Sequence, residues 1–339
     1  MRLFIFATGF MMSALSYGQT YEKIKYGDFD SWVVRTIKES GIIGGNTRTL
    51  YEVGPSRTID GAVPYTSNGA SPWGTSNVLA KVSGITKTNT TVVREKRGEG
   101  YCAKLETVLQ KVKVLGIINI KVLAAGSVFL GETIEPITST KNPMAKIKAG
   151  MPFTKRPKAL VFDYKSKLMD SPNRIYESMS SRREVKGMDM PDVILVLQKR
   201  WEDADGNIHA LRVGTMFHRF TKSTEWVNNA RFEIKYGDIT KESCYQSYMG
   251  LITGDDTKYA PNSKGKNVKI IEEGWASADE TPTHMILQFD SSYGGAYTGT
   301  VGTTFWVDNV RLEYETIPHR WPLHTTVSTN RASAGTSLS

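Results

Sequence analysis

The segment Met151–Lys167 constrains the fold of this chain most, because it reads as a β-strand with two different faces. Two prolines flank a basic pair at its start. Leu160, Phe162 and Tyr164 then stand at every second position, so their large side chains would share one side of the strand. Proline cannot donate to a strand ladder, so the prolines belong at the start of the strand. There they would hold Arg156 near the rim of the sheet.

The same period of two recurs along the chain. It is cleanest in Ala230–Tyr236, whereas Asp192–Trp201 begins apolar on both faces, as a central strand does. Tyr26–Trp32 is typical of a first edge strand. The other predicted strands are Thr49–Val53, Tyr101–Val108, Gln110–Leu123, Gly126–Gly131, Ile208–Phe217, His284–Phe289 and Phe305–Tyr314.

Long polar stretches separate these strands. They are Gly41–Ser76, Ile134–Lys148, Asp170–Met190 and Ser243–Asn267. Many short strands, turn signals between them and little helix predict an all-β chain. We therefore expect a two-sheet β-sandwich, most simply a jelly roll, with long loops.

The ends of the chain differ from its middle in composition. Residues 1–18 combine a short basic start, an apolar run and small residues before Gln19, which is typical of an export signal peptide. The apolar run is too short to span a bilayer. We expect one domain at 19–315, a disordered tail at 316–339, and an exported protein in the periplasm, at the cell surface or outer membrane, or secreted.

Charge and cysteine content limit the classes of partner and metal site that the chain can have. The formal net charge is +9 at pH 7, but the basic residues are scattered among acids, which argues against nucleic acid as a partner and leaves acidic polysaccharide open. The two cysteines, Cys102 and Cys244, lie in no zinc-binding pattern, so no metal is expected. Their spacing alone does not decide whether they pair, and buried, unpaired thiols are favoured.

Several familiar motifs are absent from the sequence or better explained otherwise. There is no nucleophile elbow, P-loop or dinucleotide fingerprint, so no cofactor is expected. The acidic run Glu202–Asn207 resembles the start of a calcium loop, but it lies between two predicted strands. A hairpin turn is the favoured interpretation.

One set of segments runs in order through the chain: Gly27–Trp32, Trp73–Asn77, Ala103–Thr107, Gly126–Gly131, Pro152–Pro157 and Ser291–Tyr314. This set resembles the Putative carbohydrate metabolism domain family of Bacteroidetes. The resemblance implies a jelly roll, sometimes preceded by a smaller immunoglobulin-like sandwich, with a glycan pocket and a link to polysaccharide use. The cysteine that often anchors members to lipid after the signal is missing here, and a separate domain is hard to fit before Trp73.

Sugar binders combine flat aromatic rings with planar polar groups, because sugar rings present apolar faces and rows of hydroxyls. Each candidate residue also has a structural explanation, such as capping a turn or pairing with a neighbouring charge. The candidate ligand-binding residues are Glu106, Arg156, Asp163, Trp226, Gln288 and Tyr293, and the candidate catalytic carboxylates are Glu106, Asp163 and Asp290.

Three functions fit these residues. The first is a glycan-binding protein without catalysis, with polysaccharide or oligosaccharide as its partner. The second is a glycoside hydrolase, which would need Glu106 paired with Asp163 or Asp290 across neighbouring strands. The third is a structural or adhesive surface protein, which would expose an apolar patch instead of a polar cleft.

Overall fold

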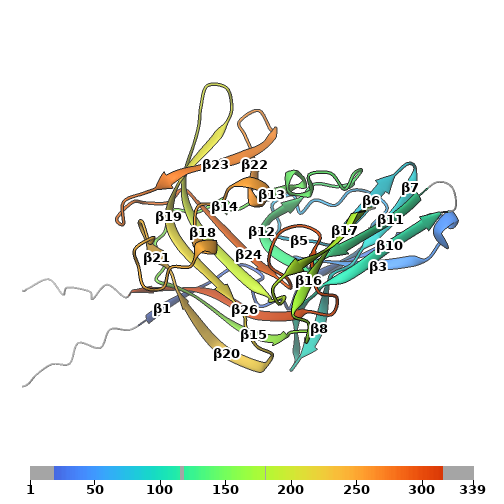
Figure 1. Cartoon of the computed structure of the whole chain (residues 1–339), viewed down its shortest axis with the longest axis horizontal. Coiled ribbons are helices and arrows are strands. Elements are labelled where there is room, and N and C mark those ends of the chain that lie inside the picture. Colours follow the sequence, from blue (N-terminus) through green and yellow to red (C-terminus); the bar gives the residue numbers. More distant parts are fainter. Residues whose placement is uncertain (1–18, 115–117, 180, 316–339) are drawn as a thin grey trace, which may run out of the picture.

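The computed structural model describes residues 19–114, 118–179 and 181–315, and these are almost entirely β-structure. The predicted signal peptide and tail lie outside the described residues. Two large sheets stack face to face, and three smaller sheets lie to one side of them (Figure 1). The prediction of an all-β sandwich is therefore confirmed.

The first large sheet contains the strand predicted within Met151–Lys167. Its strands run in the order β20, β15, β26, β9 and β8, and β1 pairs with the far part of β26. Their bounds are β20 Thr224–Glu233, β15 Ala159–Lys167, β26 Thr304–Glu315, β9 Gly100–Glu106, β8 Val92–Arg97 and β1 Gln19–Lys23.

The second large sheet is built around the apolar strand predicted from Asp192. Its order is β13, β12, β24, β18, β19, β23 and β22, and three short strands pair with β12, β24 and β19. The bounds are β13 Ile147–Ala149, β12 Ser127–Thr133, β24 His284–Asp290, β18 Asp192–Glu202, β19 Ile208–Arg219, β23 Asn267–Trp275 and β22 Tyr259–Pro261, with β5 Trp73–Thr75, β14 Met151–Pro152 and β21 Lys235–Tyr236.

The main core fills the space between the two large sheets. Leu160 and Phe162 of β15 face Leu195 of β18 and Phe289 of β24, all fully buried. Phe162 packs edge-on against Phe289 with ring centroids 5.0 Å apart. The alternation along β15 therefore sends its apolar face inward and leaves Asp163 on the opposite face.

The smaller sheets gather at the right of Figure 1. They hold β3 Thr47–Val53, β2 Trp32–Lys38 and β4 Arg57–Asp60; β6 Val78–Val82 and β7 Ile85–Asn89; and β10 Val108–Val114, β11 Ile118–Ala124, β16 Asn173–Met179, β17 Ser181–Lys186 and β25 Thr298–Gly299. The short 3-10 helices are η1 Gly41–Ile43, η2 Pro143–Lys146, η3 Ser247–Met249 and η4 Gly254–Asp256.

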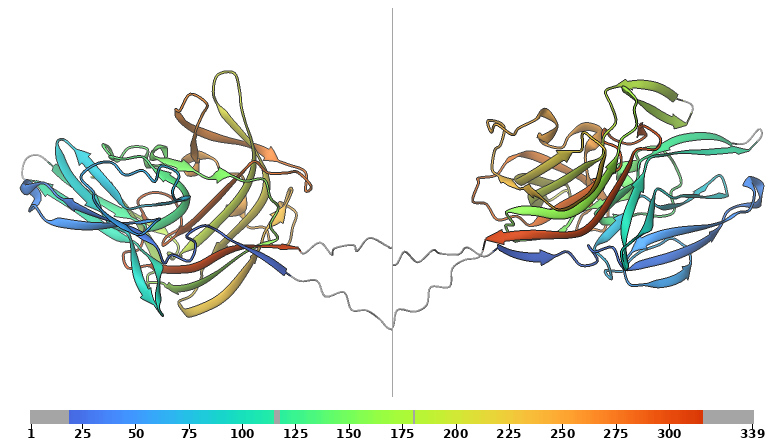
Figure 2. Two further views of the ribbon diagram at one scale, coloured as in Figure 1. Left: turned by 180° about the vertical axis from the view of Figure 1, so that it is seen from behind. Right: turned by 90° about the horizontal axis from the view of Figure 1, so that it is seen from below.

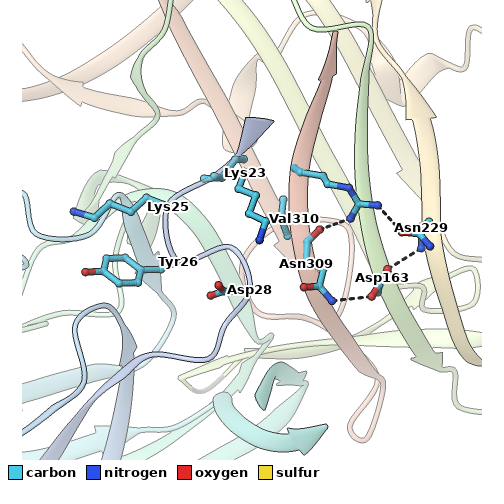
Figure 3. A pocket seen from close by; sticks show the side chains of 10 residues that line it. Lys23, Lys25, Tyr26, Asp28, Asp163, Asn229, Asn309 and Val310 are labelled. Carbon is cyan, nitrogen blue, oxygen red and sulfur yellow. Dashed lines mark hydrogen bonds between the residues drawn. The ribbon is translucent and has the colours of Figure 1, made fainter. Parts of the chain in front are cut away.

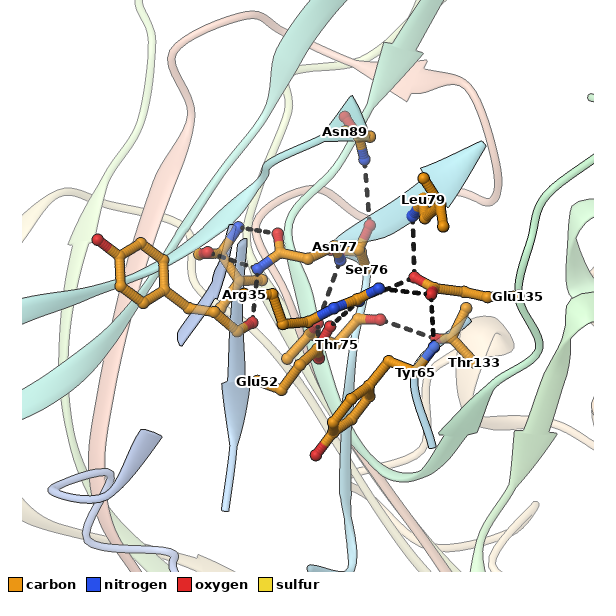
Figure 4. A network of polar contacts seen from close by, with 12 residues as sticks. Arg35, Glu52, Tyr65, Thr75, Ser76, Asn77, Leu79, Asn89, Thr133 and Glu135 are labelled. Atoms are coloured by element: carbon orange, nitrogen blue, oxygen red, sulfur yellow. Dashed lines mark hydrogen bonds and ion pairs between the residues drawn. The ribbon is translucent and has the colours of Figure 1, made fainter. Parts of the chain in front are cut away.

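A buried ion network joins β2 and β3 to the loop after β12 (Figure 4). Arg35 is fully buried and donates to Glu52 at 2.8 Å and to Glu135 at 2.7 Å. Burial raises the pKa of Glu52 to about 7, although Arg35 opposes the rise. Glu135 also accepts the backbone N–H of Leu79, so one carboxylate ties several segments together.

Four sequence-based expectations need correction. The segment Tyr26–Trp32 is not an edge strand, because it turns between β1 and β2 with Tyr26 and Phe29 at positive φ. The excursion at Asp170–Met190 contains the paired strands β16 and β17, and β17 is mostly exposed. The stretch Ser243–Asn267 holds β22. Finally, Cys244 is exposed, whereas Cys102 is buried as expected, and both thiols are free.

Candidate functional site

Two β-bulges flank Asp163 in the middle of the first sheet. The pairing of β15 shifts by one residue beside Asp163 on both sides, against β26 and against β20. Each shift coincides with an asparagine at positive φ, 54° for Asn309 on β26 and 55° for Asn229 on β20. Asparagine tolerates this left-handed conformation better than most residues, and bulges re-aim side chains next to binding sites.

The bulges surround the carboxylate of Asp163 with donors. Oδ1 accepts the Asn229 backbone N–H at 2.7 Å. Oδ2 accepts Asn309 Nδ2 and Arg97 Nη1, each at 2.9 Å. Burial alone would raise the pKa of Asp163, but these hydrogen bonds outweigh it and hold the pKa below its ordinary value. Asp163 is therefore a fixed, ionised acceptor.

Asp308 lies directly opposite Asp163 in the strand pairing and behaves differently. It accepts Arg97 Nη1 at 2.5 Å and the Asn309 backbone N–H at 2.7 Å. Burial nevertheless dominates and raises the pKa of Asp308 to about 6. The guanidinium of Arg97 also lies 3.8 Å from the ring centre of Trp226, a cation–π contact that connects this tryptophan to the two aspartates.

A cavity of about 350 Å³ opens beside this cluster (Figure 3). One wall is the segment after β1, which lies close against β26. A Cβ on Gly27 would meet the carbonyl oxygens of Ile24 and Val310 at 2.9 Å, so the close approach requires glycine. The lining residues are Lys23, Ile24, Lys25, Tyr26, Asp28, Asp163, Asn229, Asn309, Val310 and Arg311.

The lining offers hydrogen-bonding groups of several kinds in one place. Arg311 donates to Asn229 Oδ1 at 2.5 Å and to the Asn309 carbonyl at 3.0 Å, which orients its guanidinium at the cavity. Carboxylate, amide and guanidinium groups are the planar polar groups that bind sugar hydroxyls, and Tyr26 adds an aromatic ring. The cavity volume lies within the range of small-molecule sites, about 300–1,000 Å³.

A second polar cluster lies at the end of β18 and β24, on the other large sheet. Asp192 and Asp290 face each other in register and are buried. Burial first, and then the neighbouring carboxyl, raises the pKa of Asp192 well above its ordinary value, and burial raises that of Asp290. Gln288 Nε2 donates to both oxygens of Asp290 at 2.8 Å. One oxygen of Asp192 is buried without a hydrogen-bond partner.

Tyr293 lies in this second cluster. Its ring stacks under the guanidinium of Arg219 at 3.9 Å, and Arg219 is the strand partner of Asp192. The structure thus divides the predicted residues into two groups. Asp163 and Trp226 meet through Arg97, and Gln288, Asp290 and Tyr293 meet near Asp192.

Two predicted residues stand apart from both groups. Glu106 lies 3.5 Å from Lys104 on β9, and β26 separates its strand from that of Asp163. Glu106 and Asp163 are therefore not on neighbouring strands, and the pairing of Glu106 with Asp290 stays a prediction. Arg156 stacks on Tyr236 and donates to the carbonyls of Ala278 and Glu280, so it fastens a loop.

Sequence reasoning missed Arg97, Asp308, Asn229 and Asn309. The local signal is Asp308-Asn309 within a strand, after the apolar run Phe305–Val307, because such a pair favours a bulge. Trp73, in the short strand β5, is buried against Phe29.

Two of the solved structures that are similar to this chain come from Bacteroides species. The chain is similar to a putative glycoside hydrolase from Bacteroides thetaiotaomicron VPI-5482, with 18% identity and a TM-score of 0.44 over 81% of this chain and 76% of the other. It is also similar to a putative glycoside hydrolase from Bacteroides vulgatus ATCC 8482, with 14% identity and a TM-score of 0.43 over 78% of this chain and 91% of the other. No curated protein matches the chain.

The sequence of the chain matches a family model over most of its length. The model describes the Putative carbohydrate metabolism domain and covers residues 56–313, which include the cavity residues of β15, β20 and β26. The resemblance seen in the sequence is therefore confirmed, and the chain belongs to the Putative carbohydrate metabolism domain family.

Proposed function

We propose that this chain is an exported glycan-binding protein that holds sugar in the cavity beside Asp163. The observation that carries the proposal is the ordered polar lining of that cavity. Asp163, Asn229, Asn309 and Arg311 are fixed by one another before any ligand arrives. Such preorganisation lowers the entropy cost of binding a polar ligand.

The most direct test of the proposal is to replace Arg311 and measure the affinity for glycans. Affinity gel electrophoresis and calorimetry would be run with a panel of soluble polysaccharides and their oligosaccharides. Replacing Arg311→Ala removes charged hydrogen bonds and should weaken the Kd about 10- to 100-fold. Arg182→Ala is the matched control, because it removes an exposed arginine on β17, in a different sheet. Equal affinities for the two variants would contradict the proposed site.

A glycoside hydrolase is the second candidate function. It is favoured by the contrast between ionised Asp163 and Asp308, whose pKa of about 6 suits a general acid. Against it, both carboxylates accept from the same nitrogen of Arg97, which lies where a scissile bond would have to be. If the wild-type chain releases reducing ends from a polysaccharide and the Asp308→Asn variant does not, the hydrolase function is supported.

Export belongs to the proposal because residues 1–18 resemble a signal peptide. Within the residues that the structure describes, we find no helix with the length and apolar character needed to cross a membrane. Cell fractionation and sequencing of the mature amino terminus would test export. A chain recovered in the cytoplasm with Met1 in place would refute it.

A further inference from the structure

The hairpin between β18 and β19 projects beyond the sandwich (Figure 1). Trp201 on this hairpin and Ile271 on β23 are exposed apolar residues. Trp201 pairs with His209 across this hairpin, and His209 pairs in turn with Ile271 of β23. Adjacent residues in register present their side chains on the same face. Trp201 is 41% exposed and Ile271 is 43% exposed. Among the described residues, Trp201 is the one tryptophan in the group of exposed large apolar side chains.

The indole of Trp201 is held in a defined orientation. Its ring is stacked on the imidazole of His209, with centroids 5.5 Å apart and an interplanar angle of 15°. The imidazole is fixed from both sides, because Nδ1 lies 2.5 Å from Glu273 Oε1 and Nε2 lies 2.9 Å from Asp203 Oδ2. Asp203 is itself held by the turn through Asn207. One face of the indole therefore rests on the imidazole of His209, which holds the Trp201 side chain in place.

We propose that Trp201, His209 and Ile271 form a second glycan-binding site, which we name the hairpin platform. A pyranose ring would stack its apolar face on Trp201, because flat C–H faces pack well against aromatic rings. The carboxylate of Glu273 has only one oxygen bonded to His209, so the other can accept a sugar hydroxyl. The platform shares the ligand class of the proposed function but none of the cavity's residues.

A sugar fits this surface better than a protein does. A stable protein interface buries about 800 Å² on each partner around an apolar centre, whereas the platform offers two apolar side chains beside two carboxylates. A protein partner would cover those carboxylates and remove them from water, which costs free energy. A sugar chain needs only a single ring-sized apolar contact with polar groups at its edge.

The test uses the full mature chain and affinity gel electrophoresis in neutral soluble glucans, mannans, xylans and galactans. Trp201→Ala should weaken binding to at least one of these polysaccharides about 10-fold, and Trp201→Phe should weaken it less. Ile42→Ala, another exposed apolar residue, is the matched control. Circular dichroism would verify that each variant is folded, and Ile271→Thr provides a second platform variant if Trp201→Ala is not.

Combination with Arg311→Ala separates the platform from the cavity. Binding that survives Arg311→Ala and is lost on adding Trp201→Ala supports the platform even if the cavity proposal fails. Binding that Arg311→Ala weakens and Trp201→Ala leaves unchanged overturns the platform while the cavity proposal stands. If no polysaccharide of the panel retards the wild-type chain, the platform is not a site for neutral glycans and the inference is wrong.

Discussion

Asp163 and Asp308 both accept a hydrogen bond from Arg97, but the pKa of Asp163 is lowered and that of Asp308 is raised. Individual hydrogen bonds therefore decide the charge of each carboxyl group at this site. Asp163 has three donors around its carboxylate, and these outweigh its burial. Asp308 has fewer donors, and burial raises its pKa to about 6. The difference follows from the bulge geometry, which aims the Asn229 N–H and the Asn309 side chain at Asp163.

The raised pKa of Asp308 predicts a specific pH dependence of stability. Between the ordinary pKa of 3.8 and the folded value of about 6, the folded chain holds a proton that the unfolded chain has lost. The contribution of Asp308 to stability therefore falls as pH rises through this window. Asp308→Asn should gain about 2–3 kcal/mol relative to wild type between pH 4 and pH 7. Urea unfolding at several pH values measures this gain, and parallel pH profiles would contradict it.

At the scale of the strand, the bulges are what turn a regular sheet into a site. Asn229 keeps φ at 55° and still gives its backbone N–H to Asp163. Asn229→Gly should preserve both features and stay near wild-type stability. Asn229→Val places a β-branched residue in a left-handed conformation, and we expect a loss of about 1–2 kcal/mol. Chemical denaturation of the pair measures this, and equal stabilities would show that the bulge relaxes.

The sequence predicted strands well where one face is buried and poorly where neither is. Leu160 and Phe162 alternate with other residues because the core lies on one side of β15, so the period of two is visible. The hairpin β16–β17 was missed because Ser181–Lys186 is mostly exposed. The site was predicted only in part. Asp163 and Trp226 stand out by residue type, but Arg97 reaches them through strand pairing distant in sequence, which no local pattern encodes.

For the molecule as a whole, the Arg35 network links the small amino-terminal sheet to the loop that follows β12. Arg35 neutralises Glu52 and Glu135, and all three side chains are almost fully buried. Arg35→Met would leave two carboxylates uncompensated and should lower the free energy of unfolding by about 3–5 kcal/mol. Thermal unfolding of Arg35→Met and of Arg35→Met with Glu52→Gln measures this loss. The second variant should recover part of it, since one buried charge is removed.

The pairing of β1 with β26 sets Gln19 directly opposite Glu315. The outer ends of the two strands lie side by side in both views of Figure 2. The described part of the chain thus begins and ends on two adjacent strands, separated by about the spacing between neighbouring strands. A domain joined directly to Gln19 or to Glu315 would start beside the other of these two residues. Linking Glu315 back to Gln19 through a few flexible residues would give a circular topology without disturbing either sheet.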